Sequence, residues 1–152
     1  MRRDCPQPGS TDRRGPASRR FYLDYLGLAT GTDAEVTGDL RDVVATLTGV
    51  PQGTRTHMHI YREEGEPSGT YQLVDFFDAS TLRLAHREQP WLLGIALYTH
   101  EVAAVEPWIE RAAVHGTVVV AGPVAVEHLD GPRRLLLVRG PNDELIELLA
   151  PA

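Results

Sequence analysis

Apolar and polar residues alternate along several short segments of this 152-residue chain, and a period of two is typical of β-strands with one covered face. The alternation predicts strands at residues 56–62, 70–77, 92–99, 117–121 continuing as 124–129, 134–139 and 144–149. Clusters of Gly, Pro, Asn and Asp separate these segments, as hairpin turns require.

Other segments repeat apolar residues every three to four positions, which predicts helices. The first begins at residue 18, carries Phe21, Tyr22, Tyr25 and Leu26 on one face, and stops naturally at Gly27. The second covers residues 38–49, with an apolar face made by Leu40, Val43, Val44 and Leu47. The third covers residues 100–115, where Pro107 indicates either a kink or the true start of the helix.

The last predicted strand carries Glu147 among apolar residues. Because successive side chains of a strand face opposite sides, Glu147 shares a face with Leu145 and Leu149. A carboxylate there either reaches solvent at an edge or points into a cavity where a charge is needed. We expect Glu147 to face a hollow enclosed by two half-sized units.

The predicted elements occur in a similar order in both halves of the chain, which is a weak internal repeat. The second half has a strand, a helix and further strands, whereas the first half lacks an obvious opening strand. We therefore expect a disordered basic tail at 1–17, a first module at 18–79, a connector at 80–90 and a second module at 91–150.

Composition narrows the class of protein. The hydrophobic fraction of 42% suffices for a globular core, and no apolar run approaches the ~18–20 residues of a membrane helix. The basic start of the chain lacks the apolar segment of a signal peptide, so we expect a cytoplasmic protein without a membrane partner. The single cysteine, Cys5, excludes an intramolecular disulfide and a cysteine-based zinc site.

Charge is unevenly distributed. All 15 cationic side chains are arginine, and residues 1–20 hold six of them against Asp4 and Asp12, a balance of +4. With a total of −6, the remaining residues carry −10, so the predicted globule is acidic. An acidic globule with few aromatic residues argues against nucleic acid as its main partner.

His57, His59 and Tyr61 alternate with apolar residues and are expected on one strand face. Two histidines at this spacing can bind one metal ion, and with Glu147 they would form the two-histidine, one-carboxylate set suited to ferrous iron. The sequence assures no cofactor; divalent iron, zinc, manganese and nickel are the candidates. A polar cleft lining without metal, solvent exposure, and general-base catalysis by Glu147, His59 or His57 remain open alternatives.

Four motifs together resemble a known family. The segment RRFYLDYLGL (19–28) resembles the first-helix signature of the vicinal oxygen chelate superfamily, which includes lactoylglutathione lyases, bleomycin-resistance proteins and extradiol dioxygenases. The segments GTYQLVDF (69–76), LGIALYTHEVAAVEPWIERAAVHG (93–116) and RGPNDELIEL (139–148) resemble its later strands and second helix in the right order. The resemblance implies an α+β fold of paired βαβββ modules forming an incomplete β-barrel, with the first strand of module 1 degenerate or missing.

The resemblance also implies which residues would bind metal. The closing glutamate of metal-dependent members matches Glu147, their first-module glutamate matches Gln72, and their second-module histidine matches Gly94. No histidine matches the ligand of the first strand. Because such sites normally need three or more protein ligands, the usual metal site is expected to be largely lost.

The same match predicts the lining of a cleft. Gly94 and Ala96 would remove bulk, and the remaining lining residues are Gln72, Val74, Phe76, Tyr98 and Tyr61. This composition suits a small, partly aromatic ligand, whereas a closed core filled by the aromatic rings is the alternative.

We therefore expect a protein that binds a small apolar or aromatic molecule in the cleft between its modules, as resistance proteins of this superfamily do by sequestration. The alternative is a metal-dependent lyase or isomerase, or an extradiol-type dioxygenase, that uses His57, His59 and Glu147. An exposed barrel edge would favour association, so a homodimer is expected.

Overall fold

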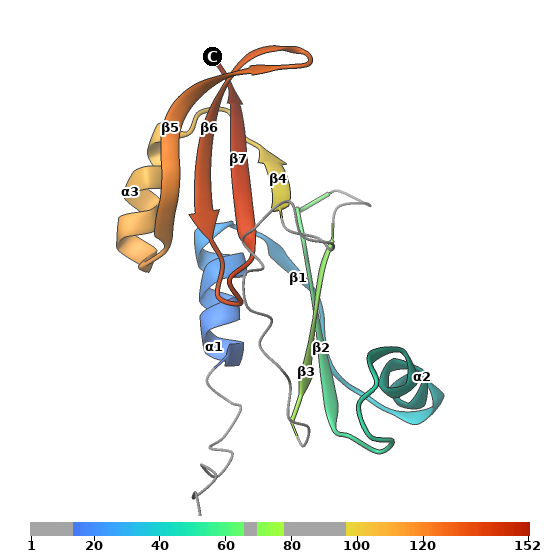
Figure 1. The fold of residues 1–152 in the computed structure, drawn as a ribbon. Coiled ribbons are helices and arrows are strands. Elements are labelled where there is room, and N and C mark those ends of the chain that lie inside the picture. Colours follow the sequence, from blue (N-terminus) through green and yellow to red (C-terminus); the bar gives the residue numbers. More distant parts are fainter. Residues whose placement is uncertain (1–13, 66–69, 78–96) are drawn as a thin grey trace, which may run out of the picture. The chain divides into compact units, whose positions relative to one another are not determined.

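The computed structural model of the chain describes residues 14–65, 70–77 and 97–152. These residues form two compact units (Figure 1). The first unit contains residues 14–16, 27–65 and 70–77, and the second contains residues 17–26 and 97–152. None of the helices in these segments is long and apolar enough to cross a membrane.

The first unit is built on a three-stranded antiparallel sheet. Its strands are β1 (Ala29–Val36), β2 (Thr56–Arg62) and β3 (Tyr71–Phe76), with β2 in the centre. Helix α2 (Gly38–Thr48) connects β1 to β2 and ends at Gly49, whose positive φ of 73° is easily adopted by glycine.

The second unit combines a helical segment from the start of the chain with the C-terminal half. Helix α1 (Arg14–Arg19), which belongs to this unit from residue 17 on, continues directly into a π-helical turn, η2 (Arg20–Tyr25). The later elements are β4 (Leu97–Glu101), α3 (Glu106–His115), β5 (Val118–His128), β6 (Gly131–Arg139) and β7 (Leu145–Pro151). Their sheet has the order β4-β7-β6-β5, in which only the β4–β7 pair is parallel.

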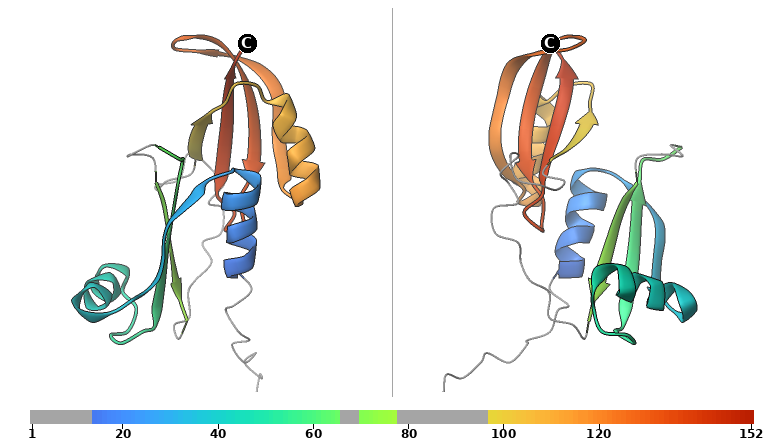
Figure 2. Two further views of the ribbon diagram at one scale, coloured as in Figure 1. Left: turned by 180° about the vertical axis from the view of Figure 1, so that it is seen from behind. Right: turned by 45° about the vertical axis from the view of Figure 1, so that its right-hand side comes forward.

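One face of this four-stranded sheet forms the core of the second unit. Leu136, Val138, Ile146 and Leu148 are fully buried on it. Helix α3 lies against the sheet (Figure 2), and η2 packs on α3 through an edge-to-face contact between Tyr25 and Trp108, whose ring centroids are 5.6 Å apart. A helix with a 3.6-residue periodicity of apolar residues has one apolar side, and packing against one face of a sheet covers that side.

A buried carboxylate ties η2 to the turn that precedes β7. The Tyr22 hydroxyl donates a hydrogen bond to one oxygen of Glu144, and the Asn142 N–H donates to the other oxygen at 2.7 Å. The backbone of Gly140 closes the same turn by donating to the Glu144 carbonyl at 2.8 Å. A Cβ at Gly140 would overlap the Glu144 side chain, so this position needs glycine.

Two sheets with helices and no closed barrel among the described residues confirm the α+β class. Strands β2, β3 and β7 begin and end within two residues of their predicted bounds. Strand β6 ends where predicted and begins three residues earlier. The third helix starts at Glu106 with Pro107 in its first turn, which is the second of the two alternatives for that proline. The expectations for residues 1–13 and 80–90, and for Gly94 and Ala96, lie outside the described residues.

Other elements differ from the expectation. Strand β1 was not predicted, because in ATGTDAEV nearly every residue is exposed and no apolar alternation arises. Helix α1 begins at Arg14 instead of residue 18. Residues 17–26 group with the second unit, whereas the sequence pattern placed residues 18–26 in the first module; their aromatic side chains pack on α3 and Glu144.

Strand β5 is one continuous strand, where the sequence indicated a break at Gly122-Pro123. A proline is tolerated because β5 lies at the edge of its sheet and the register shifts there. Gly122 has a φ of 94°, and a Cβ on it would overlap the backbone of Leu135, so the close approach of the two strands requires glycine.

We predict that Tyr22→Phe lowers the free energy of unfolding by about 1.5–3 kcal/mol, because it leaves a buried carboxylate oxygen without its hydroxyl donor. Urea denaturation of the chain and of the Tyr22→Phe, Glu144→Gln and double variants completes a double-mutant cycle. Losses that add to within about 0.5 kcal/mol would show that the two side chains are not coupled.

We also predict a specific loss of stability at alkaline pH. Burial raises the pKa of Tyr25 from 10.0 to about 12, an effect that Arg111 partly offsets. The unfolded chain ionises this phenol first, so its contribution to stability is complete below about pH 10 and is lost as the pH rises towards 12. The difference in unfolding free energy between wild type and Tyr25→Phe, measured across this range, should change with pH; a constant difference would contradict the prediction.

Candidate functional site

The central strand of the first unit carries a cluster of ionisable side chains. His57 and His59 project from the same face of β2, as the alternation predicts. The antiparallel register places Asp33 of β1 opposite His59, and Asp75 of β3 opposite His57. Both neighbouring strands therefore contribute a carboxylate to the face that bears the histidines.

The distances within this cluster are short. Oδ1 of Asp33 lies 2.7 Å from Nε2 of His57 and 3.2 Å from Nδ1 of His59. Nε2 of His59 lies 3.3 Å from Oδ2 of Asp75. The two imidazole rings stack with centroids 4.6 Å apart. One carboxylate oxygen is thus shared between two histidines, while a second carboxylate contacts the far nitrogen of His59.

Burial differs among these side chains. The His59 side chain is only 12% exposed, whereas those of His57, Asp33 and Asp75 are about one-third exposed (28%, 31% and 35%). Nδ1 of His59 is buried without a hydrogen bond, since its contact with Asp33 has ion-pair distance but not hydrogen-bond direction. One ligand atom each from Asp33, His57 and His59 lies within 4.8 Å of the others.

Sequence reasoning found the two histidines but neither aspartate. Asp33 belongs to β1, whose polar sequence does not predict a strand, so its position beside β2 was not foreseeable from the pattern. Asp75 lies in a predicted strand, and the only available signal was the pairing of β2 with β3 across a short turn.

Glu147 occupies a different environment, in the second unit. The Thr99 hydroxyl of β4 donates to its Oε1 at 2.9 Å, and Leu137 of β6 is its neighbour on the other side. These residues lie on the sheet face opposite the fully buried row of Ile146 and Leu148. Glu147 is half-buried, so its carboxylate lies neither in the core nor fully in bulk water.

The expected lining residues divide between faces in each unit. Gln72, Val74 and Phe76 share their face of the first sheet with Met58 and Ile60, opposite the histidines. Tyr61 lies on the histidine face and is 1% exposed, so it is a packed residue. In the second unit Tyr98 pairs with Ile146, on the face opposite Glu147. From the sequence, Tyr61 was expected in the same cleft lining as Gln72, Val74 and Phe76, whereas the strand register puts Tyr61 on the opposite face of the sheet.

The positions that match metal ligands of the superfamily do not make a ligand set. The Gln72 amide donates to the sulfur of Met58 at 3.3 Å, which leaves a single neutral oxygen at this position. Gly94 has no side chain that could bind. One carboxylate and one amide are fewer protein donors than a stable divalent site normally has.

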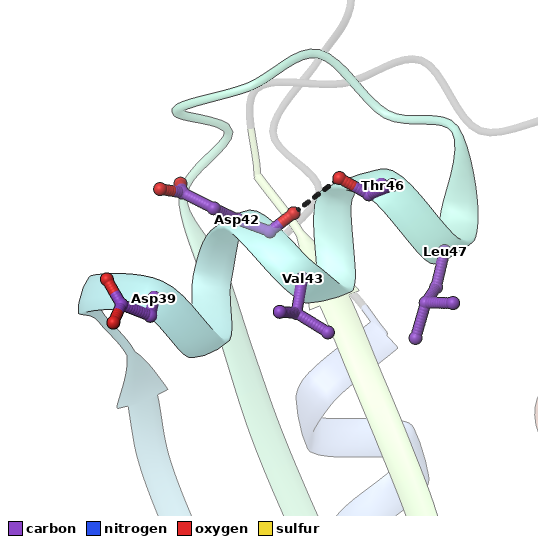
Figure 3. Close-up of a pocket in the computed structure, with 5 residues that line it drawn as sticks. All are labelled: Asp39, Asp42, Val43, Thr46 and Leu47. Carbon is purple, nitrogen blue, oxygen red and sulfur yellow. Dashed lines mark hydrogen bonds between the residues drawn. The ribbon is translucent and has the colours of Figure 1, made fainter.

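A shallow pocket of about 390 Å³ follows helix α2 (Figure 3). It is lined by Asp39, Asp42, Val43, Thr46 and Leu47, all from this one helix. The sequence predicted an apolar side on this helix; its Leu47 is 80% exposed, and the buried residue of the helix is Ala45. Only one element walls the pocket, which makes it a surface groove and not a ligand cavity.

Comparison with solved structures identifies the fold. The glyoxalase family protein from Bacillus cereus superposes with a TM-score of 0.68 at 22% identity, covering 88% of this chain and 84% of that one. A glyoxylase/bleomycin resistance protein/dioxygenase domain from Frankia gives 0.57 at 17% identity (90% and 88%). An antibiotic binding protein from Streptomyces gives 0.56 at 16% identity (91% and 87%). No protein-family model and no curated protein matches the sequence.

The chain therefore has the fold of the glyoxalase, bleomycin-resistance and dioxygenase proteins. This confirms, at the level of the fold, the resemblance to the vicinal oxygen chelate superfamily that the four sequence motifs carried.

Proposed function

We propose that this protein binds a small apolar or aromatic molecule and does not use the usual metal chemistry of its fold. The observation that carries the proposal is the partly exposed sheet face around Glu147, on which Leu97 is exposed although the strand neighbours Leu145 and Leu149 are buried. A face that combines leucines with a single carboxylate and a hydroxyl provides apolar contact together with one point of polar recognition.

The accessible apolar part of this face comes from β4 and β6, the strands on either side of β7. Leu97 of β4 is 40% exposed, and Leu135 and Leu137 of β6 are half-buried on the same side as Glu147. A flat molecule placed here would cover these side chains and could donate a hydrogen bond to the carboxylate. The Thr99 hydroxyl already donates to Glu147 and so holds its orientation.

The first unit offers a second surface of the same kind. Met58, Ile60, Val74 and Phe76 are half-buried on one face, with the exposed Gln72 as their polar neighbour. The thioether of Met58 can adapt to different apolar shapes. Each unit thus presents one sheet face that combines apolar and polar side chains, and we propose each face by itself as a ligand-binding surface.

A structural neighbour supports this proposal. The Streptomyces protein with this fold is described as an antibiotic binding protein, so a protein with this fold can bind a small molecule. By analogy, we propose sequestration of a small molecule as the role of this chain.

An enzyme remains the second candidate, because Asp33, His57 and His59 form a polar cluster that could move a proton. A lyase, isomerase or extradiol-type dioxygenase would use these histidines, with Glu147 still a predicted participant. The cluster lies on the sheet face opposite Val74 and Phe76, which separates it from the apolar surface of its own unit. This separation favours binding over catalysis.

We also propose a cytoplasmic homodimer. Strand β5 is the outer strand of its sheet, and its Val118 and Val124 are 57% and 44% exposed. An apolar edge strand of this kind is a surface that association would cover. Sedimentation of the purified chain at several concentrations tests the dimer, and a monomer throughout would contradict it.

Binding can be tested with N-phenyl-1-naphthylamine, a neutral aromatic probe that fluoresces in apolar surroundings and carries an N–H donor. We predict saturable binding, and roughly fivefold weaker binding by Leu137→Ala, since truncating a half-buried leucine removes about 1 kcal/mol of apolar contact. Phe76→Ala tests the first unit in the same way.

Matched controls come from the same chain. Leu129 is fully exposed, so Leu129→Ala should bind the probe like wild type. Glu147→Gln keeps the shape of the face and one acceptor oxygen for the probe N–H, so it should leave apolar binding largely intact. Equal affinities for wild type, Leu137→Ala and Phe76→Ala would contradict the proposal, whereas loss of a measured turnover in Glu147→Gln would favour the enzyme.

A further inference from the structure

We propose that Asp33, His57 and His59 form a binding site for one divalent transition-metal ion, with Asp75 orienting His59 from behind. The site lies entirely within the first unit and uses neither Glu147 nor any residue at the superfamily's ligand positions. It is independent of the small-molecule binding proposed above, because it occupies the other face of the first sheet.

The spacing of the donor atoms suits a transition metal. In a tetrahedral site with bonds of about 2.0 Å, neighbouring ligand atoms lie about 3.3 Å apart. The separation between Nδ1 of His59 and Oδ1 of Asp33 is 3.2 Å. The 2.7 Å between Nε2 of His57 and the same oxygen is a hydrogen-bond distance, which a small side-chain rotation would open once an ion replaces the shared proton.

The donor types point to the same class of ion. Two imidazoles and one carboxylate are the set found around zinc and non-haem ferrous iron, with the remaining positions open to water. A calcium or magnesium ion would need more oxygen donors than these three side chains supply. Nδ1 of His59 is buried and makes no hydrogen bond, so a ligand for this lone pair would remove an energetic cost.

Asp75 supplies a second, independent indication. Metal-binding histidines usually donate their other ring N–H to a carboxylate, which fixes the tautomer and the ring orientation. Nε2 of His59 lies 3.3 Å from Asp75, while Nδ1 faces Asp33. A proton on Nε2 leaves Nδ1 free to bind a metal ion.

The backbone holds the cluster rigidly and the charges favour a cation. Strand β2 is paired on both sides, so the two histidines stand on the central strand of the sheet. Glu35 pairs with His57 in register and adds a third carboxylate to the same face as Asp33 and Asp75. With neutral histidines the face is negative, and the partial exposure of His57 and Asp33 gives an ion access from solvent.

A second histidine–aspartate pair in the chain shows the contrasting arrangement. His128 contacts Asp130, but the Arg133 guanidinium donates to the same carboxylate and holds the pKa of Asp130 well below its usual range. An arginine already neutralises this aspartate, and there is one histidine instead of two. His128 is therefore a matched control for the cluster on β2.

The test uses the full chain without a histidine tag, stripped of metal and titrated with Co²⁺. We expect one equivalent to bind with the intense visible absorption of a four- or five-coordinate site, and Zn²⁺ to displace it. Asp33→Asn and His59→Gln should each weaken Co²⁺ binding by about 100-fold or more, and Asp75→Asn by about 10- to 100-fold. His128→Gln should bind like wild type.

A measurement on the unaltered protein keeps the proposal testable if a variant fails to fold. Addition of Zn²⁺ should shift the ring-nitrogen resonances of His57 and His59 in long-range ¹H–¹⁵N spectra and leave His128 unchanged. Failure to bind one equivalent of Co²⁺, unaltered binding by Asp33→Asn, or equal shifts of all the histidines would overturn the site.

Discussion

The structure of the second unit depends on a buried carboxylate that joins two segments far apart in sequence. Glu144 accepts the Tyr22 hydroxyl from η2 and the backbone N–H of Asn142 from the turn before β7. A buried charge is tolerated only when several donors satisfy it, so η2 and the turn must both be in place. The contacts of Tyr25 with Trp108 and of Arg111 with the Asp24 carbonyl then fasten the same helix to α3. Strand β7, which carries Glu147, is positioned by this arrangement.

Each sheet separates two kinds of chemistry onto its two faces. In the second unit one face is the closed core, and the other combines the exposed Leu97 and the buried Leu145 and Leu149 with Glu147 and Thr99. In the first unit one face is apolar around Met58 and Phe76, and the other carries the histidines and aspartates. Because side chains alternate along a strand, a polar cluster and an apolar surface can share the same strands without sharing a site. This is why a metal site and a small-molecule surface are proposed as separate features.

Much of the fold was predictable because it rests on periodicity. The strands with alternating residues, the helix after Glu106 and the turn at Gly140 all follow from local pattern and turn chemistry. Strand β1 was missed because a strand that is exposed on both faces needs no apolar alternation. The apolar side of α2 was predicted, but its Leu40, Val43 and Leu47 are exposed, because a pattern states only which residues share a face and not whether another element covers it.

By itself, the sequence determined the α+β class, the order of most elements, the resemblance to a known superfamily, and the two histidines on one strand face. Those properties depend on neighbours within about ten residues, where φ, ψ and side-chain direction are set by local rules. Tertiary structure alone decided that Asp33 and Asp75 flank the histidines, that Tyr22 serves the second unit, and that Gln72 and His59 lie on opposite faces. These are matters of strand register and long-range packing, which no local pattern encodes.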